Sequence, residues 1–153
     1  MSDIVFEHTG EAEQARCAGK AALALALTDA RARTLVLFDA YEAALGAGLR
    51  VPCTPELNLP LWELGHVGWF ADWWLARNPE RQRGLQANPH AARHPARQAL
   101  RGLDVDSLFN SSTVAHDLRW ALNLPCANEL RTDLTESLQH TLALLEDADD
   151  TDP

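Results

Sequence analysis

Residues that favour β-strands are scarce in this chain of 153 residues. Valine and isoleucine together number 7, whereas alanine and leucine, which favour helices, together number 50. This imbalance predicts an all-α fold, and the length suits a single domain. Cysteine is scarce as well, since Cys17, Cys53 and Cys126 lie far apart and are odd in number. They fit neither a disulfide framework nor a Cys-x-x-Cys metal site, and we interpret them as free thiols.

Basic residues are the minority among the charged ones. The chain has 13 Lys and Arg against 22 Asp and Glu, and its net charge of −9 argues against a general nucleic-acid surface. No apolar run approaches the roughly 20 residues of a membrane-spanning helix, and residues 1–14 contain neither a basic leader nor an apolar signal core. We therefore expect a cytoplasmic protein that binds neither nucleic acid nor a membrane.

Apolar periodicity predicts three long helices. The first runs from about 11 to 45 with a break near Gly19, the second covers 59–78, and the third covers about 125–147. The third is expected to face inward through five leucines, namely Leu130, Leu134, Leu138, Leu142 and Leu145. Prolines make 51–60 a stiff connector, in which Asn58 is placed to cap the second helix. We expect residues 1–10 and 148–153 to be disordered.

The segment 77–110 is predicted to be a long Arg-rich loop. Between residues 77 and 101 six arginines are opposed only by Glu80, which gives this stretch a charge of +5. Guanidinium groups suit anionic ligands, but we favour a solvated loop that offsets the acidic remainder of the chain. A short helix is expected around 113–118.

The second helix carries four of the five tryptophans and is apolar nearly all round, which predicts a buried central helix. Gly65 and Gly68 lower its helix propensity, and we expect them to allow close approach of a neighbouring helix or a ligand. Two amphipathic helices would not cover all its faces, so a fourth helix or a partner is implied.

His66 lies in the middle of this helix, among Trp62, Trp69 and Trp73. A buried imidazole needs a hydrogen-bond partner or a metal, so His66 is either a core histidine bonded to a neighbour or a metal ligand. Glu63 and His66 make one Glu-x-x-His, but the second copy that di-iron bundles need is missing.

The other histidines are weaker candidates. His90 and His94 have the spacing of a helical metal pair, but prolines at 89 and 95 bracket them and favour a surface loop. His140 is expected to be solvated, with Asp133 and Glu136, on the polar side of the third helix. His116 lies in a dense polar group beside Trp120.

Two stretches carry a family resemblance. They are NLPLWELGHVGWFADWWLARNP at 58–79 and FNSSTVAHDLRWALNLP at 109–125. They resemble the DinB-like domain that opens the non-heme iron sulfoxide synthases of ergothioneine biosynthesis, and they are most similar to the selenoneine synthase branch. The resemblance extends over roughly residues 25–147.

This resemblance implies a DinB-like up-and-down four-helix bundle packed against a C-terminal domain of the formylglycine-generating-enzyme type. It implies iron(II) held by three histidines, one at the position of His66 and two in a His-x-x-x-His on the fourth helix. Arg119 is similar to an arginine that helps to bind the sulfur donor in related synthases. The implied reaction is oxidative formation of a C–S or C–Se bond on hercynine, with a thiol or selenium donor.

About three helices of such a bundle are present, and the chain contains no His-x-x-x-His after the third. His90 and His94 lie between the two motifs, so they cannot replace that pair. We therefore expect an amino-terminal fragment of a synthase that has no catalytic residue of its own, does not stably bind iron(II) and is inactive alone. The alternatives are a non-catalytic helical module that docks a partner or dimerises, and a stand-alone DinB-like thiol transferase.

Overall fold

The computed structural model describes residues 18–95 and 103–148, which fold into helices without a β-strand. The all-α prediction is confirmed for this part of the chain. The segments expected to be disordered, 1–10 and 148–153, fall outside the described residues except for Ala148. The first turns of the predicted helix at 11–17, including Cys17, fall outside them as well.

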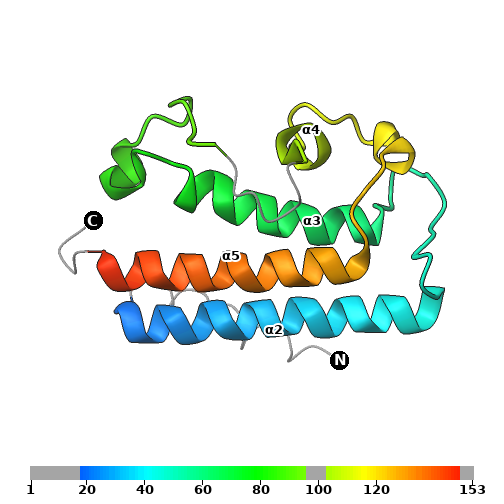
Figure 1. Ribbon diagram of the computed structural model, residues 1–153, viewed down its shortest axis with the longest axis horizontal. Helices are drawn as coiled ribbons and strands as arrows, with labels where there is room; N and C mark the ends of the chain where they lie inside the picture. Colours follow the sequence, from blue (N-terminus) through cyan, green and yellow to red (C-terminus); the bar gives the residue numbers. More distant parts are fainter. Residues whose placement is uncertain (1–17, 96–102, 149–153) are drawn as a thin grey trace, which may run out of the picture.

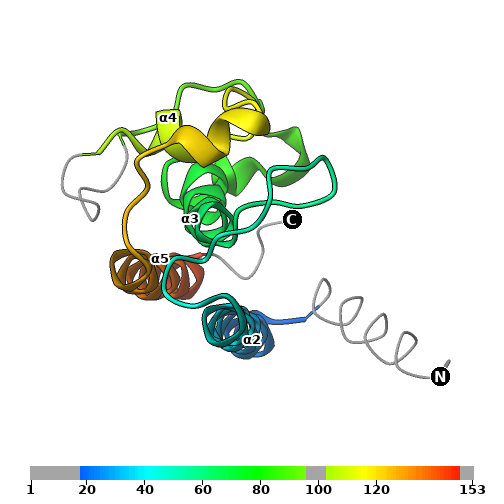
Figure 2. The same cartoon turned by 90° about the vertical axis from the view of Figure 1, so that its right-hand side faces the viewer.

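Three long helices lie side by side in the fold (Figure 1). They are α2 (Lys20–Leu45), α3 (Pro60–Ala71) and α5 (Ala127–Asp147). α3 and α5 run in the same direction and α2 runs in the opposite one (Figure 1). α5 packs against both of the others, as the view along the helices shows (Figure 2). The ends of α2 and α5 agree with the sequence predictions, because Gly19 precedes α2 and Gly46, with a φ of 76°, follows it.

α3 begins as predicted but ends differently. Leu59 is its N-cap, with Pro60 in the first turn, so the prediction that Asn58 caps the helix is wrong by one residue. The Asn58 side chain instead accepts a hydrogen bond from the Leu59 N–H and donates one to Glu63. At the other end the backbone widens into a π-helical turn, η1 (Asp72–Ala76), rather than continuing as α-helix.

Short helices interrupt the segments that the sequence predicted to be irregular. The expected Arg-rich loop contains the 3-10 segment η2 (Arg81–Gln86), which is kinked at Gly84, and the helix α4 (Val105–Phe109). α4 forms because the Asp104 side chain accepts a hydrogen bond from the Ser107 N–H. The helix expected at 113–118 is a 3-10 helix further along, η4 (Asp117–Ala121). α4 and η4 lie on the side of α3 that is remote from α2 (Figure 2).

The core lies where α3 meets α5 and α4. It consists of eight buried side chains, namely Phe38, Leu49, Trp62, Leu64, Trp69, Phe109, Leu130 and Leu134. Of the five inward leucines predicted on α5, Leu130 and Leu134 are buried and the other three are half-buried. Asp133, expected on the polar side of α5, is only 8% exposed, because α2 and α3 together cover more of α5 than a single leucine stripe.

Close helix approach at both α3 glycines is confirmed. A Cβ atom at Gly65 would overlap the Phe109 ring of α4, and one at Gly68 would lie 2.9 Å from an Asp133 carboxylate oxygen of α5. The prediction that α3 is buried all round is wrong on one side, where Phe70 is 51% exposed. Trp74 and Leu75 are exposed as well.

We expect Gly65→Ala to destabilise the fold by about 1–3 kcal/mol, because the added methyl group must displace the buried Phe109 ring. Urea unfolding measures this change. Gly48→Ala is the matched control, since its Cβ would meet only the flexible Arg50 side chain, and its effect should stay within about 0.5 kcal/mol. Equal effects of the two substitutions would contradict the close approach.

Candidate metal-ligand site around His66

One face of α3 carries a ladder of stacked rings, as the sequence spacing predicted. The Trp62 and His66 ring centroids are 4.8 Å apart, and those of His66 and Trp69 are 5.5 Å apart. Trp73 continues the ladder at 5.2 Å from Trp69. The two neighbouring indoles, of Trp62 and Trp69, therefore restrict how the His66 imidazole can turn.

The His66 imidazole is also fixed by a hydrogen bond. Its Nδ1 lies 2.8 Å from the Phe109 carbonyl oxygen at the end of α4. A carbonyl oxygen only accepts, so in the neutral ring this bond places the hydrogen on Nδ1 and leaves a lone pair on Nε2. Metal-binding histidines are oriented in this way, with one nitrogen bonded to a carbonyl and the other free for the metal. The other prediction for His66, a core histidine bonded to a neighbour, is equally consistent with this hydrogen bond.

His66 borders an open side of the molecule. Glu63 and Phe70 lie three residues before and four residues after it, so the three share one stripe of α3. Phe70 is exposed, and its ring contacts His66 with centroids 5.9 Å apart. Glu63 lines a groove of about 490 Å³ between α2 and α3. The groove is mainly apolar and includes Leu37, Tyr41, Val51, Leu57, Leu64 and Val67.

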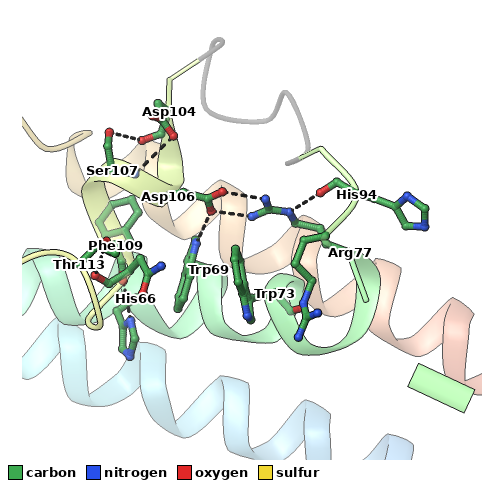
Figure 3. Close-up of polar contacts among 12 residues, drawn as sticks. His66, Trp69, Trp73, Arg77, His94, Asp104, Asp106, Ser107, Phe109 and Thr113 are labelled. Carbon is green, nitrogen blue, oxygen red and sulfur yellow. Dashed lines mark hydrogen bonds and ion pairs between the residues drawn. The ribbon is translucent and has the colours of Figure 1, made fainter. Parts of the chain in front are cut away.

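α4 is held onto this ladder from several points. The Trp62 Nε1–H donates to the Leu108 carbonyl oxygen at 2.7 Å, and the Trp69 Nε1–H donates to the Asp106 carboxylate at 2.7 Å. The Phe109 ring occupies the space that Gly65 leaves. The carbonyl that bonds His66 is therefore part of a short helix anchored by Trp62 and Trp69, and Figure 3 shows the bond from Trp69.

Arg77 completes the anchoring of α4. Its guanidinium forms a two-bond fork with Asp106, at 2.7 and 2.8 Å, and its Nε donates to the His94 carbonyl oxygen (Figure 3). It also lies 5.1 Å from the centroid of the Trp73 ring. Arg77 was not predicted as part of the site, because the Arg-rich segment was expected to be a solvated loop, whereas the side chain is buried. Its position four residues after Trp73, on the tryptophan stripe, was the signal that could have found it.

The fork also changes the titration of both groups. Hydrogen bonds from Arg77 lower the pKa of Asp106 below its ordinary value, although burial of the carboxylate opposes this shift. The Trp69 N–H lowers the same pKa further. The hydrogen bond to Asp106 in turn raises the pKa of Arg77. Both groups therefore remain charged over a wider pH range than free side chains.

Arg119 and His66 both contact Trp62. The Arg119 Cζ lies 3.7 Å from the centroid of a Trp62 ring. Its Nε is buried without a hydrogen-bond partner among the described residues. The neighbouring His116 and Trp120 contact the connector between α2 and α3 instead. His116 Nε2 lies 2.8 Å from the Leu57 carbonyl oxygen, and the Trp120 Nε1–H donates to the Val51 carbonyl oxygen at 2.9 Å.

Among the described residues, His90, His94 and His140 do not join His66. His90 and His94 are exposed, and His94 contributes through its backbone, which bonds Arg77 at both its N–H and its carbonyl. His140 is half-buried rather than solvated. Within the described residues, no group of three His, Cys, Asp or Glu could hold a metal ion.

Arg93, like Arg77, was expected to be solvated but contacts tryptophan rings instead. Its Cζ lies 5.1 Å from the Trp73 ring centroid and 5.3 Å from that of Trp74. Its guanidinium donates to the Trp73 and Ala91 carbonyl oxygens. These bonds fold the Arg-rich segment back onto the end of α3.

No protein-family model matches this chain, and no curated protein matches it. Within the part that the structure describes, none of the helices is both long enough and apolar enough to cross a membrane.

We expect the Asp106–Arg77 fork to make stability depend on acid pH. Because the pKa of Asp106 is lowered in the folded state, the fork stabilises above the ordinary pKa of 3.8 and this stabilisation is lost as the pH falls through the lowered value. Asp106→Asn should lower the Tm at pH 7, and the difference from the unchanged protein should shrink between about pH 4 and pH 2. Thermal unfolding across this range tests the expectation, which fails if the difference stays constant.

Proposed function

We propose that this chain is the DinB-like part of an iron(II)-dependent synthase that forms a C–S or C–Se bond on hercynine. His66 is one of the three histidine ligands in this proposal. The observation that carries it is the anchoring of His66, because the Phe109 carbonyl and two tryptophans orient the ring and leave Nε2 with a free lone pair. The two stretches that carry the family resemblance supply these contacts, since His66 comes from the first and Phe109 from the second.

The described residues do not fit a complete iron site. They supply one imidazole, and they contain no group of three candidate ligands. In the proposal the other two ligands belong to the His-x-x-x-His of a fourth helix, which is what the family resemblance implies. We assign no step of the reaction to this chain, and we expect it to bind iron(II) weakly on its own.

The open side between α2 and α3 supports a four-helix bundle as the complete fold. The groove there is mainly apolar, and His66 shares a stripe with Glu63, which lines it. A fourth helix packed along this side would cover Phe70 and Leu37, which are exposed. It would also bring its own side chains near the open edge of the His66 ring.

We further propose that Arg119 binds the carboxylate of the sulfur or selenium donor. Stacking on Trp62 holds the guanidinium plane, and the buried Nε has no partner among the described residues. A guanidinium suits a carboxylate because it offers paired N–H donors in a fixed plane.

A non-catalytic module that dimerises is the second candidate. The observation that favours it is the exposed surface of α2, where Leu25 is 73% and Val36 is 68% exposed. Such a module should be a stable dimer with a sharp thermal transition, whereas the proposed synthase segment should bind hydrophobic dyes and aggregate. The thiol transferase alternative requires tight, stoichiometric metal binding by this chain that is lost in His66→Ala.

The test of the proposed synthase begins with the gene beyond codon 153. We expect the reading frame to continue into a helix with His-x-x-x-His and then a larger domain. In the protein encoded by the whole frame, His66→Ala should remove most of the bound iron, measured by metal analysis, and abolish formation of the C–S or C–Se bond. His90→Ala is the control and should leave both unchanged, because His90 is exposed in the Arg-rich segment. Full iron content in His66→Ala would refute the proposal.

A further inference from the structure

A continuous series of contacts connects Arg77 to His66 through Asp106 and α4. The Arg77 fork holds Asp106, the second residue of α4, and Phe109 at the end of α4 holds His66 Nδ1 through its carbonyl oxygen. α4 is only five residues long. A helix of this length is not stable alone, so outside contacts must set its position.

Among these contacts, the Arg77–Asp106 fork contributes the most and the strongest hydrogen bonds to Asp106. Asp106 receives three hydrogen bonds from outside α4, and two of them come from Arg77. Hydrogen bonds between charged groups are about twice as strong as neutral ones, and the two-bond fork also fixes direction. The Arg77 side chain is 7% exposed, so solvent cannot readily take over these bonds.

We infer that Arg77 is a positioning residue for His66, acting through Asp106 and α4 to keep the Phe109 carbonyl on Nδ1. The consequence is a defined tautomer, with hydrogen on Nδ1 and the lone pair on Nε2. A free imidazole prefers the opposite tautomer, so the carbonyl has to reverse this preference. The inference rests on the proposed function in one respect, because only that function assigns the Nε2 lone pair to a metal. The tautomer itself can be measured without metal.

The test is NMR of the full chain with ¹⁵N-labelled histidine, at about pH 8, where a free imidazole is neutral. Ring-nitrogen shifts distinguish protonated from unprotonated nitrogens, and comparison with His66→Gln assigns the His66 signals among the six histidines. We expect His66 to have hydrogen on Nδ1 in the unchanged protein. In Arg77→Met this form should fall from the major to the minor species.

Arg131→Met is the matched control. Arg131 also forms ion pairs, with Asp39 and Glu42, but these connect α5 to α2 rather than to α4. It should therefore lower stability without changing the His66 tautomer. A tautomer that stays the same in Arg77→Met, or that shifts equally in Arg131→Met, would overturn the inference.

A second variant keeps the test decisive if Arg77→Met does not fold. Asp106→Asn retains an oxygen for the Trp69 N–H but removes the charge from the fork. It should shift the His66 tautomer in the same direction to a smaller extent, and an unchanged tautomer in this folded variant would refute the inference. If the tautomer behaves as expected while His66→Ala of the whole-frame protein keeps its iron, the proposed function fails and the positioning role stands.

Discussion

Gly65 allows α4 to approach α3 so closely that the Phe109 ring lies where a side chain at position 65 would be. Without this approach the Phe109 carbonyl oxygen could not lie 2.8 Å from His66 Nδ1. The same approach brings Asp106 within reach of Trp69 and Arg77. A single missing methyl group thus determines both the packing of α4 and the hydrogen bonding of His66. The propensity cost of glycine inside a helix, about 1 kcal/mol, is offset by these contacts.

The polar groups around α4 are satisfied in a way that makes the region cooperative. The indole N–H groups of Trp62 and Trp69 each donate to α4, so their burial carries no unpaired donor. Asp106 receives two kinds of donor, a guanidinium and an indole, and both lower its pKa. Loss of Arg77 would remove two of the three hydrogen bonds that Asp106 receives from outside α4 and leave the carboxylate partly buried, which costs more than one such bond contributes. The imidazole in the middle is consequently held more rigidly than its half-buried position alone would ensure.

Local sequence patterns predicted the parts of this fold that depend on neighbours along the chain. The tryptophan stripe and the place of His66 on it follow from helical spacing, and the close approach at Gly65 follows from the presence of a glycine inside a helix. The family membership and the metal role of His66 remain predictions. Arg77 was misplaced because its burial depends on Asp106, a residue 29 positions away. Asp133 was misplaced for a similar reason, since α5 is covered on two sides and a helical wheel describes only one partner.

The two sides of α3 have opposite characters, and this contrast explains how one helix can serve both stability and a site. Toward α4 and α5 its residues are buried and bonded, whereas on the other side Glu63, which lines the groove, and Phe70 remain accessible. His66 lies at the boundary, with Nδ1 on the bonded side. An imidazole placed entirely in the core would have both nitrogens occupied or excluded from ligands, and one placed entirely on the surface would rotate freely. At the boundary the ring is oriented by the core while its second nitrogen remains available, which is the condition that a metal ligand requires.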